Sequence, residues 1–235
     1  MNQLWKNPPW WLTIVTLAAA FGLLMFAALG NQTLIRPGPT FDVLSAVHPG
    51  TAKPSGSLLV LTVNETSGFG LDVVTCWLDS SCAVAETDSS STSETLSTQR
   101  EQADAAAREV TATQPTQTYA VNLPGVVGPS AGLASALALT SARTGSVLVG
   151  PGRTVAVTGT ITTDGSVGPV GQIPLKAAAA AQAGASIMIV PRGQGIDVTG
   201  SDMTVVEVDS LQGAVRWLCD NAAGHGPACT DASGK

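Results

Sequence analysis

A serine in this chain stands where a nucleophile could work. Ser130 lies in the run Gly-Pro-Ser-Ala-Gly at 128–132, whose small residues leave room for a peptide backbone to approach. A helix is expected at 132–140, so free backbone N–H groups beside Ser130 could stabilise a developing oxyanion. A serine hydroxyl in this setting can attack a carbonyl carbon, provided that a base takes its proton.

Lysine is a better source of that base than histidine. The sequence has two histidines, His48 and His225, and both lie in stretches rich in Gly and Pro. Lys176 falls in the first turn of an expected Ala-rich helix over 174–183, where the helix dipole disfavours an added positive charge. Apolar neighbours add desolvation, which lowers the pKa of the ammonium group further. A neutral amine there could accept the proton of Ser130.

Both residues also have an ordinary structural interpretation. Ser130 could simply cap the N-terminus of the helix that follows it. Lys176 could be a surface lysine whose apolar stem lies along the helix and whose charge reaches water. From the residue types alone, these alternatives stay open.

The helices and strands that must position these side chains can be expected from the sequence, and their order predicts a mixed α/β domain over 55–220. Short apolar stretches bounded by Gly, Pro or Asn predict strands, and Ala-rich stretches predict helices. Strands are expected at 57–63, 119–123, 154–162 (broken by Gly159), 167–171, 186–191 and 203–208, and helices at 99–110, 132–140, 174–183 and 210–219. A Ser/Thr-rich loop is expected at 85–98, and a loop-like C-terminal tail at 221–235.

Three ordered motifs resemble the proteolytic domain of Lon proteases. They are Gly-Pro-Ser-Ala-Gly at 128–132, Val-Thr-Gly-Thr-Ile at 157–161, and Gly-x-Val-x-Pro-Val-Gly-x-Ile-x-x-Lys at 165–176. The resemblance covers about 55–220 and implies the Lon proteolytic fold, which is similar to the ribosomal protein S5 domain 2-like fold. It also implies hydrolysis of peptide bonds without a metal or other cofactor.

The resemblance assigns a role to each matching residue. Ser130 matches the nucleophile of the family's Ser-Lys dyad, and Lys176 matches its general base. Thr158 matches a threonine whose hydroxyl helps to hold that lysine. The oxyanion would be held by backbone around Gly128 and Ser130. Because the cytosolic members form rings, a homo-oligomer is also an expectation.

A closer resemblance is to membrane-anchored Lon-like proteins of Gram-positive bacteria. The shared features are an N-terminal anchor, an Arg-Pro-Gly-Pro-Thr neck at 36–40 and Thr-Gly-Thr-Ile at 158–161. Many of those proteins carry a PDZ domain, but residues 110–128 leave no room for one here. The sequence also has no P-loop motif, so no ATPase module is expected. The implied activity is therefore ATP-independent cleavage of unfolded or exposed protein segments.

The stretch 10–30 predicts a membrane span. It holds no charge over 21 residues, and a helix of that length covers about 30 Å, the thickness of a bilayer's hydrocarbon core. Trp5, Trp10 and Trp11 suit the membrane interface, and Lys6 gives a slight bias toward a cytoplasmic N-terminus. A cleaved signal peptide is the alternative.

The expected organisation follows from this span. The cytoplasmic N-terminus is 1–9, the single-pass signal anchor 10–30, the neck 31–54 (with a stiff, turn-rich stretch at Ile35–Thr40), the proteolytic domain 55–220 and the tail 221–235. The catalytic domain would lie outside the cytoplasmic membrane.

The four cysteines form two close pairs, Cys76 with Cys82 and Cys219 with Cys229. Two local disulfides in an oxidising compartment are the favoured interpretation. A zinc site with His225 as an extra ligand is the alternative, although neither pair has the short spacing that is usual for zinc.

Composition narrows the function classes. The formal net charge is −6 and charged residues make up 12%, about half the usual share of about 25%. No basic stripe is present to neutralise phosphates, which argues against nucleic-acid binding. The remaining alternative to a protease is a non-catalytic, membrane-tethered binding or scaffold protein on the same fold.

Overall fold

The computed structural model describes most of the 235 residues. The described residues are 9–28, 32–48, 56–85, 92–111, 118–124, 126, 128–198 and 202–233. The chain divides into two compact units, one made of Met1–Arg36 with Glu65–Thr87 and the other of Pro37–Asn64 with Asp88–Lys235.

A mixed sheet runs through the fold, which confirms the predicted mixed α/β class. Its strand order is β10-β9-β6-β3-β1-β4. The strands β3 (Ser57–Gly68), β6 (Thr154–Val157), β9 (Ile187–Pro191) and β10 (Thr204–Val208) are parallel to one another, whereas β1 (Gln32–Asp42) and β4 (Ala83–Ala85) pair antiparallel. Two small antiparallel ribbons complete the strands: β2 (Val47–His48) with β5 (Ala120–Val121), and β7 (Thr160–Ile161) with β8 (Val167–Gly168).

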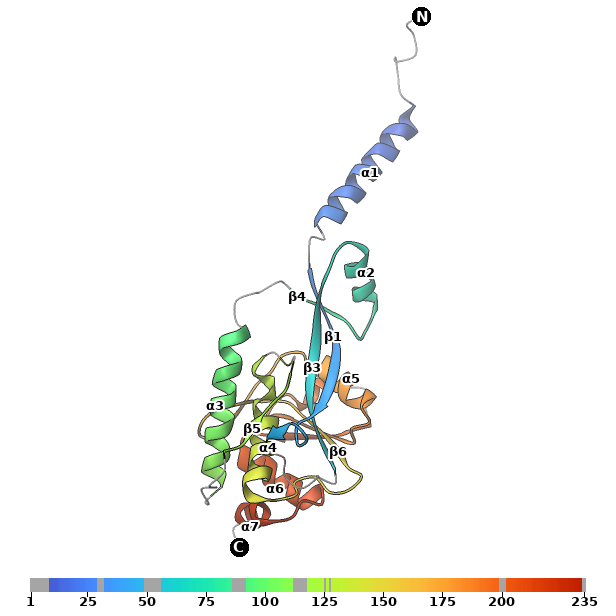
Figure 1. Cartoon of the computed structure of the whole chain (residues 1–235). Helices are drawn as coiled ribbons and strands as arrows, with labels where there is room; N and C mark the ends of the chain where they lie inside the picture. The colour runs from blue at the N-terminus through green and yellow to red at the C-terminus, as the bar shows by residue number, and fades with distance from the viewer. Residues whose placement is uncertain are drawn as a thin grey trace, which may run out of the picture. The chain divides into compact units, whose positions relative to one another are not determined.

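Successive side chains of the central strands point to opposite faces of the sheet, and this gives the larger unit two apolar layers. Val155 and Val157 of β6 belong to one buried cluster, and Ala156 between them belongs to the other. This is the period of two that a pleated strand imposes. The first cluster includes residues of α3 (Thr92–Val110), α4 (Gly132–Thr144), α6 (Leu211–Asn221) and α7 (Pro227–Ser233), and the second includes residues of α5 (Ile173–Gln182). Figure 1 shows α5 on the opposite side of the sheet from α4 and α6.

Small residues explain why α4 lies in the centre of its layer. Its sequence, Gly-Leu-Ala-Ser-Ala-Leu-Ala-Leu-Thr-Ser-Ala-Arg-Thr, gives almost every face a small or apolar side chain, and ten of its residues are buried. A helix that is apolar all round is stable only when it is covered on all sides. The helix ends at Gly145, whose φ of 65° is the left-handed geometry of a helix C-terminus.

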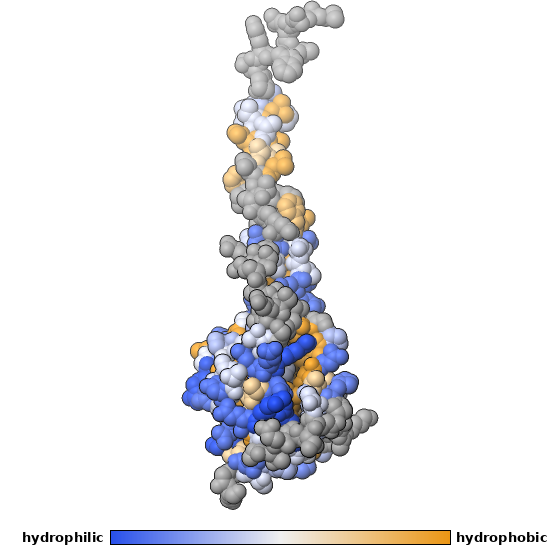
Figure 2. Space-filling view, turned by 60° about the vertical axis from the view of Figure 1, so that its left-hand side comes forward, coloured by the Kyte–Doolittle hydropathy of each residue, from blue (hydrophilic) through white to orange (hydrophobic). Residues whose placement is uncertain are grey.

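The smaller unit contains the N-terminal helix α1 (Trp10–Ala28) and the helix α2 (Leu71–Leu78). Apolar side chains of α1 are exposed, as the orange atoms along it show (Figure 2). Among the residues that the structure describes, no helix combines the length and the hydropathy needed to cross a bilayer. The predicted span 10–30 extends beyond this description, which omits residues 29–30 and the side chains of 24–28.

The predicted turn-rich neck at Ile35–Thr40 is wrong as local structure, because these residues lie within the strand β1. A close approach between β1 and β3 explains the difference. A Cβ at Gly38 would lie 2.5 Å from Thr62 Oγ1, and the Thr62 hydroxyl donates a hydrogen bond of 2.6 Å to the Pro39 carbonyl. Glycine at 38 thus permits a strand where the flanking prolines indicated a bend.

The predicted loop over 221–235 is also wrong, because α7 occupies Pro227–Ser233. Ala228 and Ala232 are buried in the main apolar cluster. The disulfide between Cys219 and Cys229 fixes α7 to the end of α6, with a Cα–Cα distance of 5.5 Å. The other predicted disulfide, Cys76–Cys82, is present as well, so all four cysteines are paired as the favoured interpretation had them.

Other predicted boundaries shift by a few residues. The helix expected from 99 begins at Thr92, so part of the predicted Ser/Thr-rich loop at 85–98 is helical, while 86–91 lie outside the described residues. The strand expected over 154–162 is divided into β6 and β7 around Gly159, as predicted. The helix α2 was not anticipated.

Replacing Cys219 and Cys229 together by Ser is expected to lower the free energy of unfolding by about 2–3 kcal/mol, because the bridge closes a short loop in the unfolded chain. Denaturant unfolding measures this change, followed by the fluorescence of Trp217 in proteins whose other four tryptophans are replaced by Phe. The matched control is the double variant Cys76→Ser/Cys82→Ser, which acts in the other unit. Equal shifts of the Trp217 transition in both double variants would contradict the prediction.

Candidate active site

The turn that carries Ser130 is a short 3₁₀ segment, η1 (Pro129–Ala131), which continues directly into α4. Gly128 precedes it with φ of 102°, a conformation that side chains with a Cβ rarely adopt. Ser130 itself is half-buried. No hydrogen bond joins its hydroxyl to any residue that the structure describes. The hydroxyl is therefore free to meet a substrate or a base.

Backbone hydrogen bonds fix this turn against the end of β6. The Gly159 N–H donates to the Ser130 carbonyl at 3.0 Å, and the Leu133 N–H donates back to the Gly159 carbonyl at 3.0 Å. A Cβ at Gly159 would lie 3.2 Å from Leu133 Cβ, so a larger residue would push the two segments apart. The Thr158 N–H, next in the chain, donates to the Ile189 carbonyl at 3.1 Å. The position of Ser130 is thus set by the central sheet.

Lys176 comes from α5, on the other face of the sheet. Its side chain is buried, with only 4% of the residue exposed. Its N–H donates to the carbonyl of Gln172 at 3.0 Å, and Gln172 has φ of 61°, a left-handed conformation that is strained for a residue with a side chain. Burial lowers the pKa of the Lys176 amine from 10.5 to about 8.

Thr158 connects the two predicted residues. Lys176 Nζ donates to Thr158 Oγ1 at 3.4 Å, and Thr158 Oγ1 donates to the carbonyl oxygen of Ser130 at 3.4 Å. Thr158 is fully buried. The structure therefore brings the side chains of Lys176 and Thr158 together beside the Ser130 main chain, and among the described residues no hydrogen bond joins Ser130 Oγ directly to Lys176 Nζ.

Gln99 is a residue near the site that the sequence reasoning missed. It lies on α3, and its side-chain oxygen accepts a hydrogen bond of 3.1 Å from the Ile161 N–H. The same oxygen would lie 2.5 Å from a Cβ at Gly132, so α3 presses directly on the start of α4. The one sequence signal that could have indicated this role is that Gln99 is a polar residue on the otherwise Ala-rich side of the predicted helix 99–110.

Gln194 is a second residue that was missed. Its side-chain oxygen accepts from the Val170 N–H at 3.0 Å, and its side-chain nitrogen donates to the Val170 carbonyl at 2.8 Å. Val170 belongs to the segment that leads into the helix of Lys176. No local sequence pattern reveals a contact between residues 24 positions apart, so this interaction could not be predicted.

A small apolar cavity of about 20 Å³ lies beside the Ser130 turn. Its lining is mainly apolar, with a few polar side chains among them. The lining residues are Gln99, Arg100, Val121, Leu123, Val126, Gly128, Ala131, Gly132 and Ser135. This volume holds about one water molecule, so the cavity is too small for a peptide side chain.

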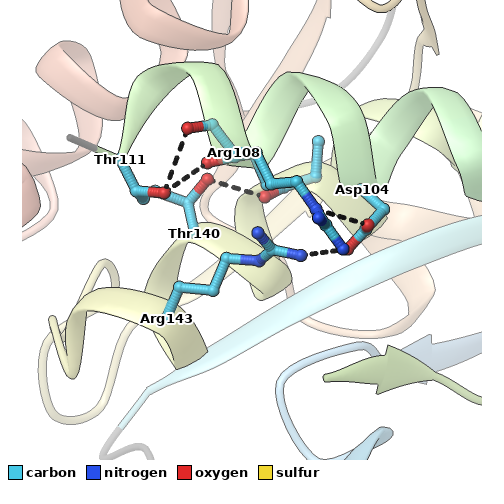
Figure 3. A network of polar contacts seen from close by, with 7 residues as sticks. Asp104, Arg108, Thr111, Thr140 and Arg143 are labelled. Atoms are coloured by element: carbon cyan, nitrogen blue, oxygen red, sulfur yellow. Dashed lines mark hydrogen bonds and ion pairs between the residues drawn. The ribbon is translucent and has the colours of Figure 1, made fainter. Parts of the chain in front are cut away.

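A buried ion pair holds together the two helices that flank this cavity. Arg143 of α4 pairs with Asp104 of α3, and Arg108 pairs with the same carboxylate at 2.9 Å (Figure 3). The Arg143 side chain is only 3% exposed. Removing Asp104 would leave that charge buried without its partner, which is strongly destabilising. The network therefore fixes α3 against α4.

The lowered pKa of Lys176 predicts how stability depends on pH. Below pH 8 the amine is charged in both folded and unfolded chains, so folding carries the full desolvation penalty. Between pH 8 and 10.5 only the unfolded chain keeps the proton, so the penalty shrinks as pH rises. Lys176→Met is therefore expected to raise the free energy of unfolding by about 2–3 kcal/mol at pH 7, and by much less at pH 10.5.

Urea unfolding of both proteins between pH 6 and about 10.5 measures this difference. Thr158→Val serves as the control, because it removes the hydrogen bond to Lys176 but leaves the titrating amine in place. A Lys176→Met effect that stays constant across this pH range would contradict a lowered lysine pKa.

Comparison with known proteins identifies the family. The model of the Lon protease (S16) C-terminal proteolytic domain matches residues 85–212, more than half of the chain, and this range contains all three residues of the site. A Lon protease of Chloroflexus aurantiacus is 40% identical over 90 residues, which are 36% of this chain and 10% of that protein. The chain thus spans about a tenth of that relative's length. A proteolytic domain of this kind indicates a serine peptidase. The chain belongs to the family of Lon protease (S16) C-terminal proteolytic domains.

Proposed function

We propose that this protein is a serine endopeptidase that uses Ser130 as nucleophile and Lys176 as general base. The observation that carries the proposal is the buried Lys176 amine, which contacts Thr158 while Thr158 contacts the Ser130 backbone. A lysine with a pKa of about 8 is neutral in a usable fraction of molecules near neutral pH. An ordinary surface lysine, with a pKa near 10.4, is not.

The reaction starts when Ser130 Oγ attacks the carbonyl carbon of the scissile peptide bond. The hydroxyl proton passes to Lys176 Nζ, and the negative charge develops on the carbonyl oxygen. The Ser130 N–H, at the start of the η1 turn, is the oxyanion donor that we propose, with Gly128 setting the turn. Lys176 then protonates the leaving amine, the C–N bond breaks, and an acyl ester remains on Ser130.

A water molecule completes the cycle. It gives a proton to the neutral Lys176 as it attacks the ester, and Lys176 returns that proton to Ser130 Oγ when the acyl group leaves. Thr158 holds the amine in place throughout, so it is a positioning residue. Hydrogen bonds between catalytic groups often tighten only when substrate is bound, which fits a free hydroxyl on Ser130.

The substrates that we propose are unfolded or exposed protein segments. The chain has no P-loop sequence to drive ATP-dependent unfolding. Segments that are already unfolded or exposed are therefore the expected substrates.

We also propose that residues 10–30 anchor the protein in the cytoplasmic membrane, with the peptidase outside. The support comes from the uncharged stretch of 21 residues and from the exposed apolar side chains along α1, such as Leu17, Phe21 and Leu23. The two disulfides fit an oxidising compartment.

Replacing either dyad residue is expected to abolish peptide cleavage. Ser130→Ala removes the nucleophile, and Lys176→Arg keeps a cation that cannot accept a proton, so each should lower kcat/KM at least about 1,000-fold. Cleavage of an unfolded protein such as casein by the full chain measures this loss. Ser45→Ala is the matched control, because Ser45 is exposed and, among the described residues, its hydroxyl bonds the Asp42 carbonyl alone. Equal activity in all variants would favour the non-catalytic scaffold.

The pH profile tests the assigned base. Because only the neutral amine accepts a proton, kcat/KM should fall about tenfold per pH unit below pH 8 and level off above it. Thr158→Val should lower kcat roughly 10–100-fold with little change in KM, since the threonine positions the amine and touches no substrate. A flat profile from pH 6 to 9 would contradict Lys176 as base.

A further inference from the structure

The helix α2 has a large apolar surface that its own unit leaves uncovered. Val73 and Cys76 face inward and are buried with Leu34. On the other side of the helix, Leu71 and Leu78 are seven positions apart and share a face. Leu71 is 73% exposed and Leu78 is 84% exposed.

Trp77 extends this surface and indicates what kind of environment covers it. It is 64% exposed, and an amphipathic indole ring favours the boundary between membrane and water. The helix carries no lysine or arginine, and its one charge is Asp72. Apolar insertion therefore fits this surface better than electrostatic attraction to anionic headgroups.

Covalent connections place α2 close to the proposed anchor. Three residues, 29–31, separate the end of α1 at Ala28 from the start of β1 at Gln32, and this link reaches at most about 14 Å. The first part of β1 pairs with β4, with Thr33 opposite Ala85. The disulfide Cys76–Cys82 then ties α2 to the residue directly before β4.

We propose that the exposed face of α2, formed by Leu71, Trp77 and Leu78, lies in the interface of the lipid bilayer as a second, shallow membrane contact. This inference rests on the proposed membrane anchor at residues 10–30. Three side chains cover far less than the roughly 800 Å² per partner that a stable protein interface needs. A zwitterionic lipid surface is therefore the assigned occupant, and a second copy of the chain is not.

Fluorescence quenching by labelled lipids tests this contact in the full chain. Three variants each keep one tryptophan, at 11, 77 or 217, and have Phe at the other four positions. Each is reconstituted into phosphatidylcholine vesicles with a bromine or spin label near the headgroup. The Trp77 emission should be quenched at least about twofold, whereas Trp217, in the larger unit, should keep its intensity.

Trp11 separates this inference from the proposed anchor. Quenching of Trp11 without quenching of Trp77 would overturn the α2 contact and leave the anchor standing. Quenching of neither would overturn both. A Trp77 that is shielded from aqueous acrylamide but not quenched by labelled lipid would show a protein partner, which also overturns the proposal.

A substitution test asks whether the lipid quenching of Trp77 depends on the exposed leucines of α2. In the Trp77-only protein, Leu71→Ser/Leu78→Ser should remove most of the lipid quenching. The matched control is Ile196→Ser, which changes a side chain that is 83% exposed in the larger unit and should leave the quenching unchanged. A thiol assay confirms that the Cys76–Cys82 bridge remains formed. Unchanged quenching in the double variant would overturn the proposal.

Discussion

The chemistry that we propose for this protein depends on the burial of one amine. Lys176 is enclosed on α5 with Thr158 as its hydrogen-bond partner, and enclosure makes the charged form unfavourable. No carboxylate is paired with it among the described residues, so desolvation acts without compensation. In the mechanism that we propose, the fold carries this penalty in order to keep a base that works near neutral pH. The same burial that activates the amine therefore weakens the folded state.

The sheet brings the parts of the site together from opposite layers. Ser130 belongs to the layer of α4, and Lys176 belongs to the layer of α5. The end of β6, at Thr158 and Gly159, is the place where both layers can be reached, with backbone bonds to the Ser130 turn and a side-chain contact to the lysine. The ends of parallel strands serve as sites in many α/β proteins for the same reason.

Much of this arrangement could be predicted because it depends on sequence patterns that extend over only a few residues. The small residues around Ser130, the proline at the start of the lysine's helix and the close cysteine pairs all act over a few positions. The helix α7 and the strand β1 were missed because their formation depends on distant partners, namely the Ser146 hydroxyl that accepts from the Ala228 N–H and the approach of Thr62 to Gly38. Gln99 and Gln194 were missed for the same reason, since each bonds the backbone of a segment far away in the chain.

The two hydrogen bonds of Gln194 join the segment that follows β9 to the segment that leads into α5. A displacement of Gln194 would break or strain its two hydrogen bonds to Val170. Val170 lies six residues before Lys176 in the sequence. Glu207 adds a second attachment, since its carboxylate accepts the Gly195 N–H at 2.7 Å. The side chains of Gln194 and Glu207 therefore link the segment after β9 to β10 and to the residues that lead into the helix of Lys176.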